Sequence, residues 1–184
     1  MYYCKYALFI FDEMDKIPVS LMDVIKQYVS LEAPTQFKNS IFMFLSNSAS
    51  QDITQKSFDL ESTNSIKREN FESKMFRKII EDKIFNAKIK INDDEKGFWH
   101  LDLIKSQSID HYIPFLPLKL EHIKLCIRAE FKKINYAMRS EDDVDAIAEE
   151  LNYEPEGFYL YSSTGCKRIP QLVRSRIISQ KTEL

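Results

Sequence analysis

The sequence predicts an α/β core with a parallel sheet, followed by a small helical domain. Two apolar runs, residues 6–11 and 41–45, lack the alternation of half-exposed strands. Such runs are typical of parallel strands that helices cover on both faces. Apolar residues spaced by three and four lie between the two runs and predict a helix there. After Leu118 the periodicity is that of helices.

The first strand ends at two adjacent carboxylates, Asp12 and Glu13. Ligands bind at the carboxyl ends of the strands in an open α/β sheet. An Asp at this edge is suited to hold a Mg²⁺ that bridges nucleotide phosphates, and the neighbouring Glu to orient and deprotonate a water. The alternative is a solvated turn after a core strand, and the spacing alone leaves both interpretations open.

The next two elements complete a strand, helix, strand unit. The predicted helix begins near Pro18 and carries its apolar stripe to Val29, and the second strand ends at Asn47. A right-handed crossover makes the two strands parallel neighbours. We therefore expect Asn47 to lie at the same edge as Asp12 and Glu13.

The rest of the core has weaker patterns. Residues 48–67 are polar and predict a surface loop with at most a short turn of helix. Residues 71–84 have the periodicity of a second amphipathic helix, and a charged connection follows. Residues 112–118 predict a short or edge strand, because Pro114 and Pro117 remove ladder donors.

Three helical segments are expected in the C-terminal part. The first has apolar residues from Leu120 to Ile134, the second is capped by Ser140, and the third begins near Thr164. We place the boundary at Leu118, which gives a core domain of residues 1–118 and a helical domain of residues 119–184.

Composition excludes several classes of function. The chain has 184 residues, with 26 basic and 28 acidic side chains and a net charge of −2, so nucleic acid is not an expected partner. Cys4, Cys126 and Cys166 are far apart and form no C-x-x-C motif, so buried thiols are the default interpretation. The three histidines do not share a helix face, and no metal cluster is expected from them.

The two ends of the sequence favour different compartments. Residues 1–6 lack the pattern of a secretory signal, which favours the cytosol. Residues 181–184 read Lys-Thr-Glu-Leu, which differs at one position from the Lys-Asp-Glu-Leu signal for retention in the endoplasmic reticulum.

Five motifs in collinear order resemble the torsins, Clp-related AAA+ ATPases of the endoplasmic reticulum and nuclear envelope lumen. The motifs are Phe-Ile-Phe-Asp-Glu-Met-Asp-Lys at residues 9–16, Phe-Leu-Ser-Asn at 44–47, Gly-Phe-Trp-His at 97–100, Pro-Phe-Leu-Pro-Leu at 114–118 and Gly-Cys-Lys at 165–167. The resemblance implies part of an AAA+ three-layer core with a parallel sheet, followed by a helical lid.

The resemblance also implies roles for single residues. Asp12 and Glu13 correspond to the Walker B pair, with Asp12 acting through the Mg²⁺ of bound ATP and Glu13 polarising the hydrolytic water. Asn47 corresponds to sensor 1, and Lys167 corresponds to sensor 2, a lid cation that reaches the γ-phosphate.

The lid cysteines match a pair in the torsins. Cys126 and Cys166 correspond to the cysteines that are thought to couple redox state to nucleotide binding, so a role in an oxidising lumen competes with the interpretation as buried thiols. Pro170 departs from a smooth helix after the sensor, and we expect it to remove a helix donor near Lys167.

The resemblance further implies partners. Clp-type relatives carry a catalytic Arg where this chain has Ser108, and the nearest basic residue is Lys105. Torsins also lack this Arg and take one from the lumenal domain of a type II membrane activator. Other torsin subunits are expected partners as well, and peripheral association with a membrane is compatible with the family.

A phosphate-binding loop is missing. The motif G-x-x-x-x-G-K-[ST] does not occur in the sequence, which has three glycines in all. Whether the chain is an enzyme by itself is therefore uncertain, and we expect it to be an inactive portion of an ATPase. A truncated gene product or gene model is the favoured explanation, ahead of a splice form and an experimental fragment. The alternative function is a non-catalytic interaction subunit that binds a full-length torsin or its activator.

Overall fold

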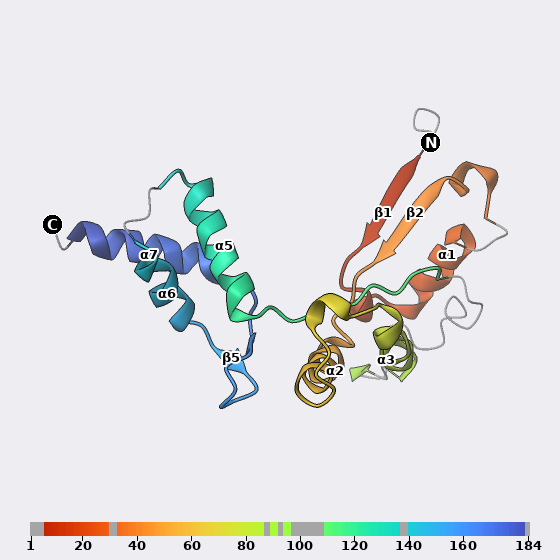
Figure 1. The fold of residues 1–184 in the computed structure, drawn as a ribbon. Coiled ribbons are helices and arrows are strands. Elements are labelled where there is room, and N and C mark those ends of the chain that lie inside the picture. Colours follow the sequence, from red (N-terminus) through yellow and green to blue (C-terminus); the bar gives the residue numbers. More distant parts are fainter. Residues whose placement is uncertain are drawn as a thin grey trace. The chain divides into compact units, whose positions relative to one another are not determined.

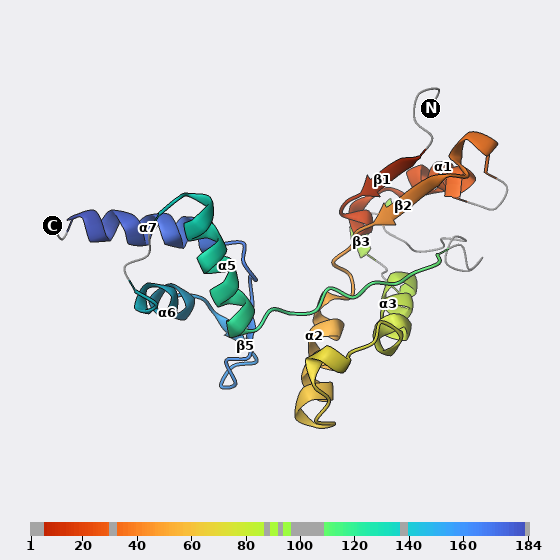
Figure 2. The same cartoon turned by 45° about the horizontal axis from the view of Figure 1, so that its top comes forward.

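The protein is described by a computed structural model, in which the chain forms two compact units, Met1–Leu116 and Pro117–Leu184. Figures 1 and 2 show the elements of each unit from two directions. Each unit is described by itself below. The residues that the structure describes are 6–29, 33–86, 89–91, 94–96, 109–136 and 140–182.

Two parallel strands lie at the centre of the first unit. Strand β1 (Ala7–Phe11) pairs with β2 (Ser40–Phe44), in register from Ala7 opposite Ser40 to Phe11 opposite Phe44. Helix α1 (Val19–Val29) connects them and lies beside the sheet in both views (Figures 1 and 2). The predicted strand, helix, strand unit with parallel strands is confirmed, whereas a full three-layer core is not seen among the described residues.

One face of this sheet is packed. Phe9 stacks on Phe42 and Phe11 on Phe44, with ring centroids 5.0 and 5.3 Å apart. Phe11 and Phe44 also join a cluster around the buried residues Met14 and Ile25. The cross-strand aromatic pairs and the contact with α1 stabilise this side of the sheet.

The opposite face of the sheet is exposed. Leu8, Ile10, Ile41 and Met43 have exposed fractions between 41% and 64%. The prediction that both strands are buried on both faces is therefore wrong for the described residues. Period-2 alternation places these four side chains opposite the stacked aromatic rings, and no described element covers them.

A helix occupies much of the predicted surface loop. Helix α2 (Ser50–Ser62) buries Ile53, Ser57 and Leu60, and it packs with Phe76 of α3 (Lys74–Asn86). The loop prediction for residues 48–67 is wrong because the few apolar residues of α2 are spaced for one helix face. The Ser57 hydroxyl donates to the Ile53 carbonyl at 2.7 Å, so a buried hydroxyl does not disrupt the helix.

The remaining segments of this unit are short. Strands β3 (Ile89–Ile91) and β4 (Asp94–Lys96) form an antiparallel hairpin in the predicted charged connection. Three 3₁₀ turns complete the described elements, namely η1 (Met14–Lys16), η2 (Thr35–Phe37) and η3 (Arg68–Asn70). The strand predicted over residues 112–118 is wrong, because these residues form no strand. Its two prolines lack the amide hydrogens that a ladder needs.

The described residues of the second unit form three helices, and all three were predicted. They are α5 (Leu120–Lys133), α6 (Asp142–Glu149) and α7 (Ile169–Thr182). Strands β5 (Tyr153–Glu154) and β6 (Tyr161–Ser162) form a small hairpin between α6 and α7. Ile123, Ile127, Val144, Ile147 and Val173 are fully buried where the helices meet.

The start of α7 corrects the expectation for Pro170. The helix begins at Ile169, so Pro170 is its second residue. Amide hydrogens in the first turn have no partner within a helix, and proline therefore fits there without loss of a bond. Among the described residues, no helix combines the length and apolar character that crossing a bilayer requires.

Candidate functional site

The chain turns sharply where β1 ends. Asp12 follows the strand directly, and Glu13 has the left-handed backbone angles φ 52° and ψ 45°. The Glu13 amide donates to Asp12 Oδ1 at 2.8 Å. A glutamate in this region of backbone space is uncommon, and such residues are frequent at functional sites. The turn leaves both carboxylates exposed at the carboxyl end of β1.

Backbone hydrogen bonds join this turn to the end of β2. The Leu45 amide donates to the Phe11 carbonyl at 2.8 Å, and the Met14 amide donates to the Leu45 carbonyl at 2.9 Å. Met14 is fully buried and anchors the turn. Residues 12–13 and 45–47 thus continue from neighbouring strand ends at one edge of the sheet, which is where the sequence analysis expects Asp12, Glu13 and Asn47.

Asp15 also lies at this edge, although no role was predicted for it from the sequence. Its Oδ1 accepts a hydrogen bond from the Ser46 hydroxyl at 3.0 Å and from the Asn47 amide at 3.3 Å. The Ser46 and Ser48 hydroxyls also share a bond of 2.9 Å. Asp15 therefore holds the backbone that carries Asn47. The sequence signal that could have indicated a role for Asp15 is its position three residues after Asp12, in the same turn.

Glu13 has a cationic neighbour in this structure. Lys16 Nζ lies 2.6 Å from Glu13 Oε1, and this hydrogen bond raises the pKa of Lys16. The two side chains are 63% and 53% exposed, so water screens the pair and it adds little stability. Glu13 is therefore free to exchange Lys16 for a water molecule.

The edge fits a nucleotide-bound Mg²⁺ better than a metal held by protein alone. The described residues contain no group of three or more His, Cys, Asp or Glu arranged for a metal ion. Mg²⁺ commonly binds through one or two carboxylates together with substrate phosphates and waters. Asp12 uses Oδ1 for the Glu13 amide, and its second carboxylate oxygen has no hydrogen bond to a described residue. The donor set suits that arrangement.

Lys167 belongs to the second unit. It is exposed in the turn before α7, where its amide donates to the Thr164 carbonyl at 3.3 Å. No ion pair of Lys167 occurs within the described part of the chain. Gly165, with φ 55°, allows the turn to reverse toward the helix. An exposed ammonium next to a fixed turn is suited to contact an anion.

The two lid cysteines form a disulfide. Cys126 of α5 and Cys166 of the turn before α7 have an S–S distance of 2.04 Å and a Cα–Cα distance of 6.2 Å. The default interpretation of these residues as buried thiols is therefore wrong. The bond fixes the residue directly before Lys167 to α5.

Some residues named from the sequence lie outside the described part of the chain. These are Cys4, the Gly-Phe-Trp-His motif at residues 97–100, Lys105, Ser108 and the last two residues. Their predicted roles stay predictions.

Removal of the Asp15 carboxylate is expected to loosen the segment that carries Asn47. In an Asp15→Ala variant, we expect amide hydrogen exchange at Asn47 to accelerate about fivefold, because a hydrogen bond to a charged acceptor contributes roughly 1 kcal/mol at an exposed site. Asp15→Asn keeps one acceptor oxygen and should show a smaller effect. Equal exchange rates in wild type and Asp15→Ala would contradict this role for Asp15.

Comparison with known proteins finds torsins among the relatives of this chain. The family model described as "Torsin-1A, C-terminal domain" matches residues 118–174. The chain is 34% identical to a Torsin-like protein of Caenorhabditis elegans over 173 residues, which is 90% of this chain and 46% of the relative. It is 33% identical to human Torsin-3A over 178 residues, which is 92% of this chain and 42% of that protein. The chain thus spans less than half the length of these relatives.

Proposed function

Because this chain belongs to the torsin family of AAA+ proteins, we propose that it carries the Walker B, sensor and lid residues of an ATPase that remodels proteins or membranes. The observation that supports this most is the parallel register of β1 and β2, which brings Asp12, Glu13 and the Asn47 backbone to one sheet edge.

Each residue of the proposed site has a chemistry suited to its role. Mg-ATP, when bound, supplies the phosphate that water attacks. Asp12 would hold the Mg²⁺ of the nucleotide, and Glu13 would orient the water and accept its proton. The side-chain amide of Asn47 would hold the same water by a hydrogen bond. By the resemblance to the torsins, Lys167 would be the lid cation that responds to the γ-phosphate and so distinguishes ATP from ADP.

We propose that the chain does not complete this reaction by itself. Its sequence contains no phosphate-binding loop, and Ser108 stands where Clp-type relatives have an Arg. A lumenal domain of a membrane-bound activator would supply the missing guanidinium, which stabilises charge in the transition state. The Cys126–Cys166 disulfide supports a location in the oxidising lumen of the endoplasmic reticulum or nuclear envelope.

Nucleotide assays on two proteins test the proposal. The isolated chain should bind Mg-ATP weakly, with a Kd above about 1 mM, since it lacks the loop that cradles the phosphates. A chimera in which the Torsin-3A segment before the matched region precedes residues 6–184 should hydrolyse ATP with an activator present. Tight binding of Mg-ATP by the isolated chain would contradict the importance of the missing loop.

Two substitutions in the chimera assign the residues. Glu13→Gln should lower kcat by at least about a hundredfold and leave Mg-ATP binding intact, because the amide cannot accept the proton. Glu69→Gln, at an exposed residue of η3, is the matched control and should leave both unchanged. An active Glu13→Gln chimera would refute the assignment of Glu13.

A second function, a non-catalytic interaction subunit, is favoured by the apolar surface of the first unit. Leu8, Ile10, Ile41 and Met43 are exposed on one face of the sheet. Parallel sheets normally have both faces covered, and a contiguous exposed apolar surface commonly marks a protein interface. If the chain has this second function, we propose that a full-length torsin or its activator covers the exposed face of the sheet.

Binding assays separate the two functions. Under the second function, the isolated chain co-purifies with Torsin-3A, and an Ile10→Lys, Ile41→Lys variant loses that binding. Lys26→Glu, which changes a charge on α1, serves as the control. Retained binding by the double variant would rule out the sheet face as the interface.

A further inference from the structure

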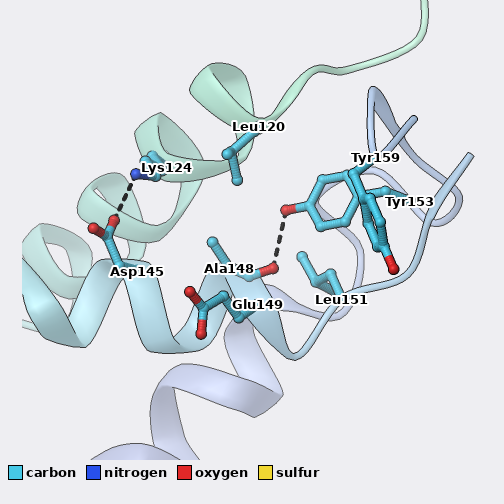
Figure 3. A pocket seen from close by; sticks show the side chains of 8 residues that line it. All are labelled: Leu120, Lys124, Asp145, Ala148, Glu149, Leu151, Tyr153 and Tyr159. Atoms are coloured by element: carbon cyan, nitrogen blue, oxygen red, sulfur yellow. Dashed lines mark hydrogen bonds and ion pairs between the residues drawn. The ribbon is translucent and has the colours of Figure 1, made fainter. Parts of the chain in front are cut away.

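The second unit contains a cavity that has no part in the proposed ATP chemistry. Its volume is about 270 Å³, and it is lined by residues of α5, α6 and the β5–β6 hairpin region (Figure 3). Leu120, Ala148 and Leu151 provide aliphatic walls, and Tyr153 and Tyr159 line one end. The lining is therefore mainly apolar and aromatic.

The cavity is already formed in the free chain. Ala148 and Leu151 are only 1% and 4% exposed, so the core fixes their positions. The Tyr153 hydroxyl donates to the Ala148 carbonyl at 2.9 Å, which holds the ring in place. Burial raises the pKa of Tyr153, so it stays a neutral donor. A pre-formed apolar cavity needs little reorganisation to receive a ligand group.

The charges at the cavity favour a cationic ligand. At the end away from the tyrosines, Lys124 Nζ and Asp145 Oδ1 form an ion pair of 2.6 Å and neutralise each other (Figure 3). Glu149 is the remaining charged residue of the lining, and it makes no ion pair within the described ranges. Glu150, Glu154 and Glu156 are exposed on the adjoining chain and likewise have no ion pair with a described residue. The segment from Asp145 to Tyr159, which supplies most of the lining, thus carries five acidic side chains and no basic one.

Size and exposure indicate a side chain as the ligand group. Pockets for drug-sized molecules and cofactors have volumes of about 300–1,000 Å³, and this cavity is smaller. Tyr159 at its end is 72% exposed, and Leu120 is 41% exposed. Exposed aromatic residues beside a small apolar cavity are typical of positions where a protein partner inserts one anchor residue.

We propose that this cavity is a docking site for a protein segment in which one large apolar side chain is flanked by Lys or Arg. The apolar side chain fills the space between Leu120, Leu151 and the two tyrosines. The flanking cations lie against Glu149 and its acidic neighbours. The site requires no nucleotide, and the inference does not depend on the ATPase activity proposed above.

Three labelled peptides test this on the complete 184-residue chain. The sequences are Gly-Lys-Lys-Phe-Lys-Lys-Gly, the same peptide with Ala in place of Phe, and the same peptide with Glu in place of every Lys. Fluorescence polarisation should show binding of the first, with at least about tenfold weaker binding of the other two. Added salt should weaken the first interaction, because its charges are exposed.

Paired variants locate the peptide. Tyr159→Ser and Glu149→Lys should each weaken binding about tenfold, since they remove an aromatic wall and reverse the lining charge. Phe158→Ser, at a neighbouring residue that does not line the cavity, and Glu69→Lys, an equal change of net charge at an exposed residue of η3, are the controls and should have smaller effects. Methyl resonances of Leu120, Ala148 and Leu151 in the wild-type chain should shift on addition of the first peptide, a measurement that needs no variant.

Three results would overturn the proposal. One is equal binding of the Phe and Ala peptides, and another is stronger binding of the Glu peptide. The third is that the methyl resonances of Leu120, Ala148 and Leu151 do not shift with the first peptide and shift instead as the protein concentration rises, which would assign the cavity to self-association.

Discussion

Reduction of the Cys126–Cys166 disulfide is expected to lower the free energy of unfolding of the second unit by about 2–4 kcal/mol. The cysteines are 40 residues apart in the sequence, and the segment between them contains α6 and the β5–β6 hairpin. Cross-linking a loop of this length removes much of the conformational freedom of the unfolded chain. The reduced protein regains that freedom on unfolding and is therefore less stable.

Denaturation and hydrogen exchange measure this effect. Guanidinium titration of the complete chain, with and without reductant, should show a lower midpoint for the reduced form. Amide protons of α5 and α7 should then exchange faster, while those of α3 in the other unit should change little. Exchange should also rise in the turn with Lys167, because Cys166 no longer ties that turn to α5.

Cysteine variants provide the controls for this prediction. The double variant Cys126→Ala, Cys166→Ala should be as unstable as the reduced protein and insensitive to reductant. The Cys4→Ser variant keeps both cysteines of the disulfide, so its stability should respond to reductant as that of the wild type does. Identical denaturation midpoints for the oxidised and reduced wild type would show that the bond does not stabilise the unit.

The sheet edge is the part of the fold that was most predictable from the sequence. The residues at this edge can be predicted from local sequence, because each apolar run ends at polar residues and a right-handed crossover makes the two strands parallel. The position of Asp15 was less predictable, since its hydrogen bonds to Ser46 and the Asn47 amide span more than thirty residues of sequence. Such contacts depend on how two turns meet in space.

Other features depend on tertiary packing and were missed for that reason. Helix α2 has few apolar residues, and only its contact with Phe76 shows that Ile53 and Leu60 share a buried face. The resemblance to the torsins singled out Cys126 and Cys166 as a redox pair, but the spacing of the cysteines alone does not indicate that the turn before α7 lies against α5. The exposure of Leu8 and Ile41 was not predictable either, because an apolar run does not show what covers it.

The Asp143→Ala variant is expected to destabilise the second unit by about 2–4 kcal/mol, because the buried Gln180 and the partly exposed Arg176 lose their acceptor. Asp143 on α6 is only 4% exposed. Its Oδ1 accepts hydrogen bonds from Arg176 Nε at 3.1 Å and from Gln180 Nε2 at 2.6 Å, both on α7. The Tyr136 hydroxyl in turn donates to Gln180 Oε1 at 3.3 Å, so the network joins three segments.

The comparison with a neighbouring carboxylate makes this prediction specific. Asp145 lies on the same helix, is 52% exposed and pairs with Lys124, so Asp145→Ala should cost at most about 1 kcal/mol. Asp143→Asn retains an acceptor oxygen and should fall between the two alanine variants. Urea denaturation of the complete chain measures the free energy of unfolding of the three variants, and hydrogen exchange locates the change in stability. If Asp143→Ala is no less stable than Asp145→Ala, the network does not hold α6 against α7, and the buried contacts of Val144, Ile147 and Val173 suffice.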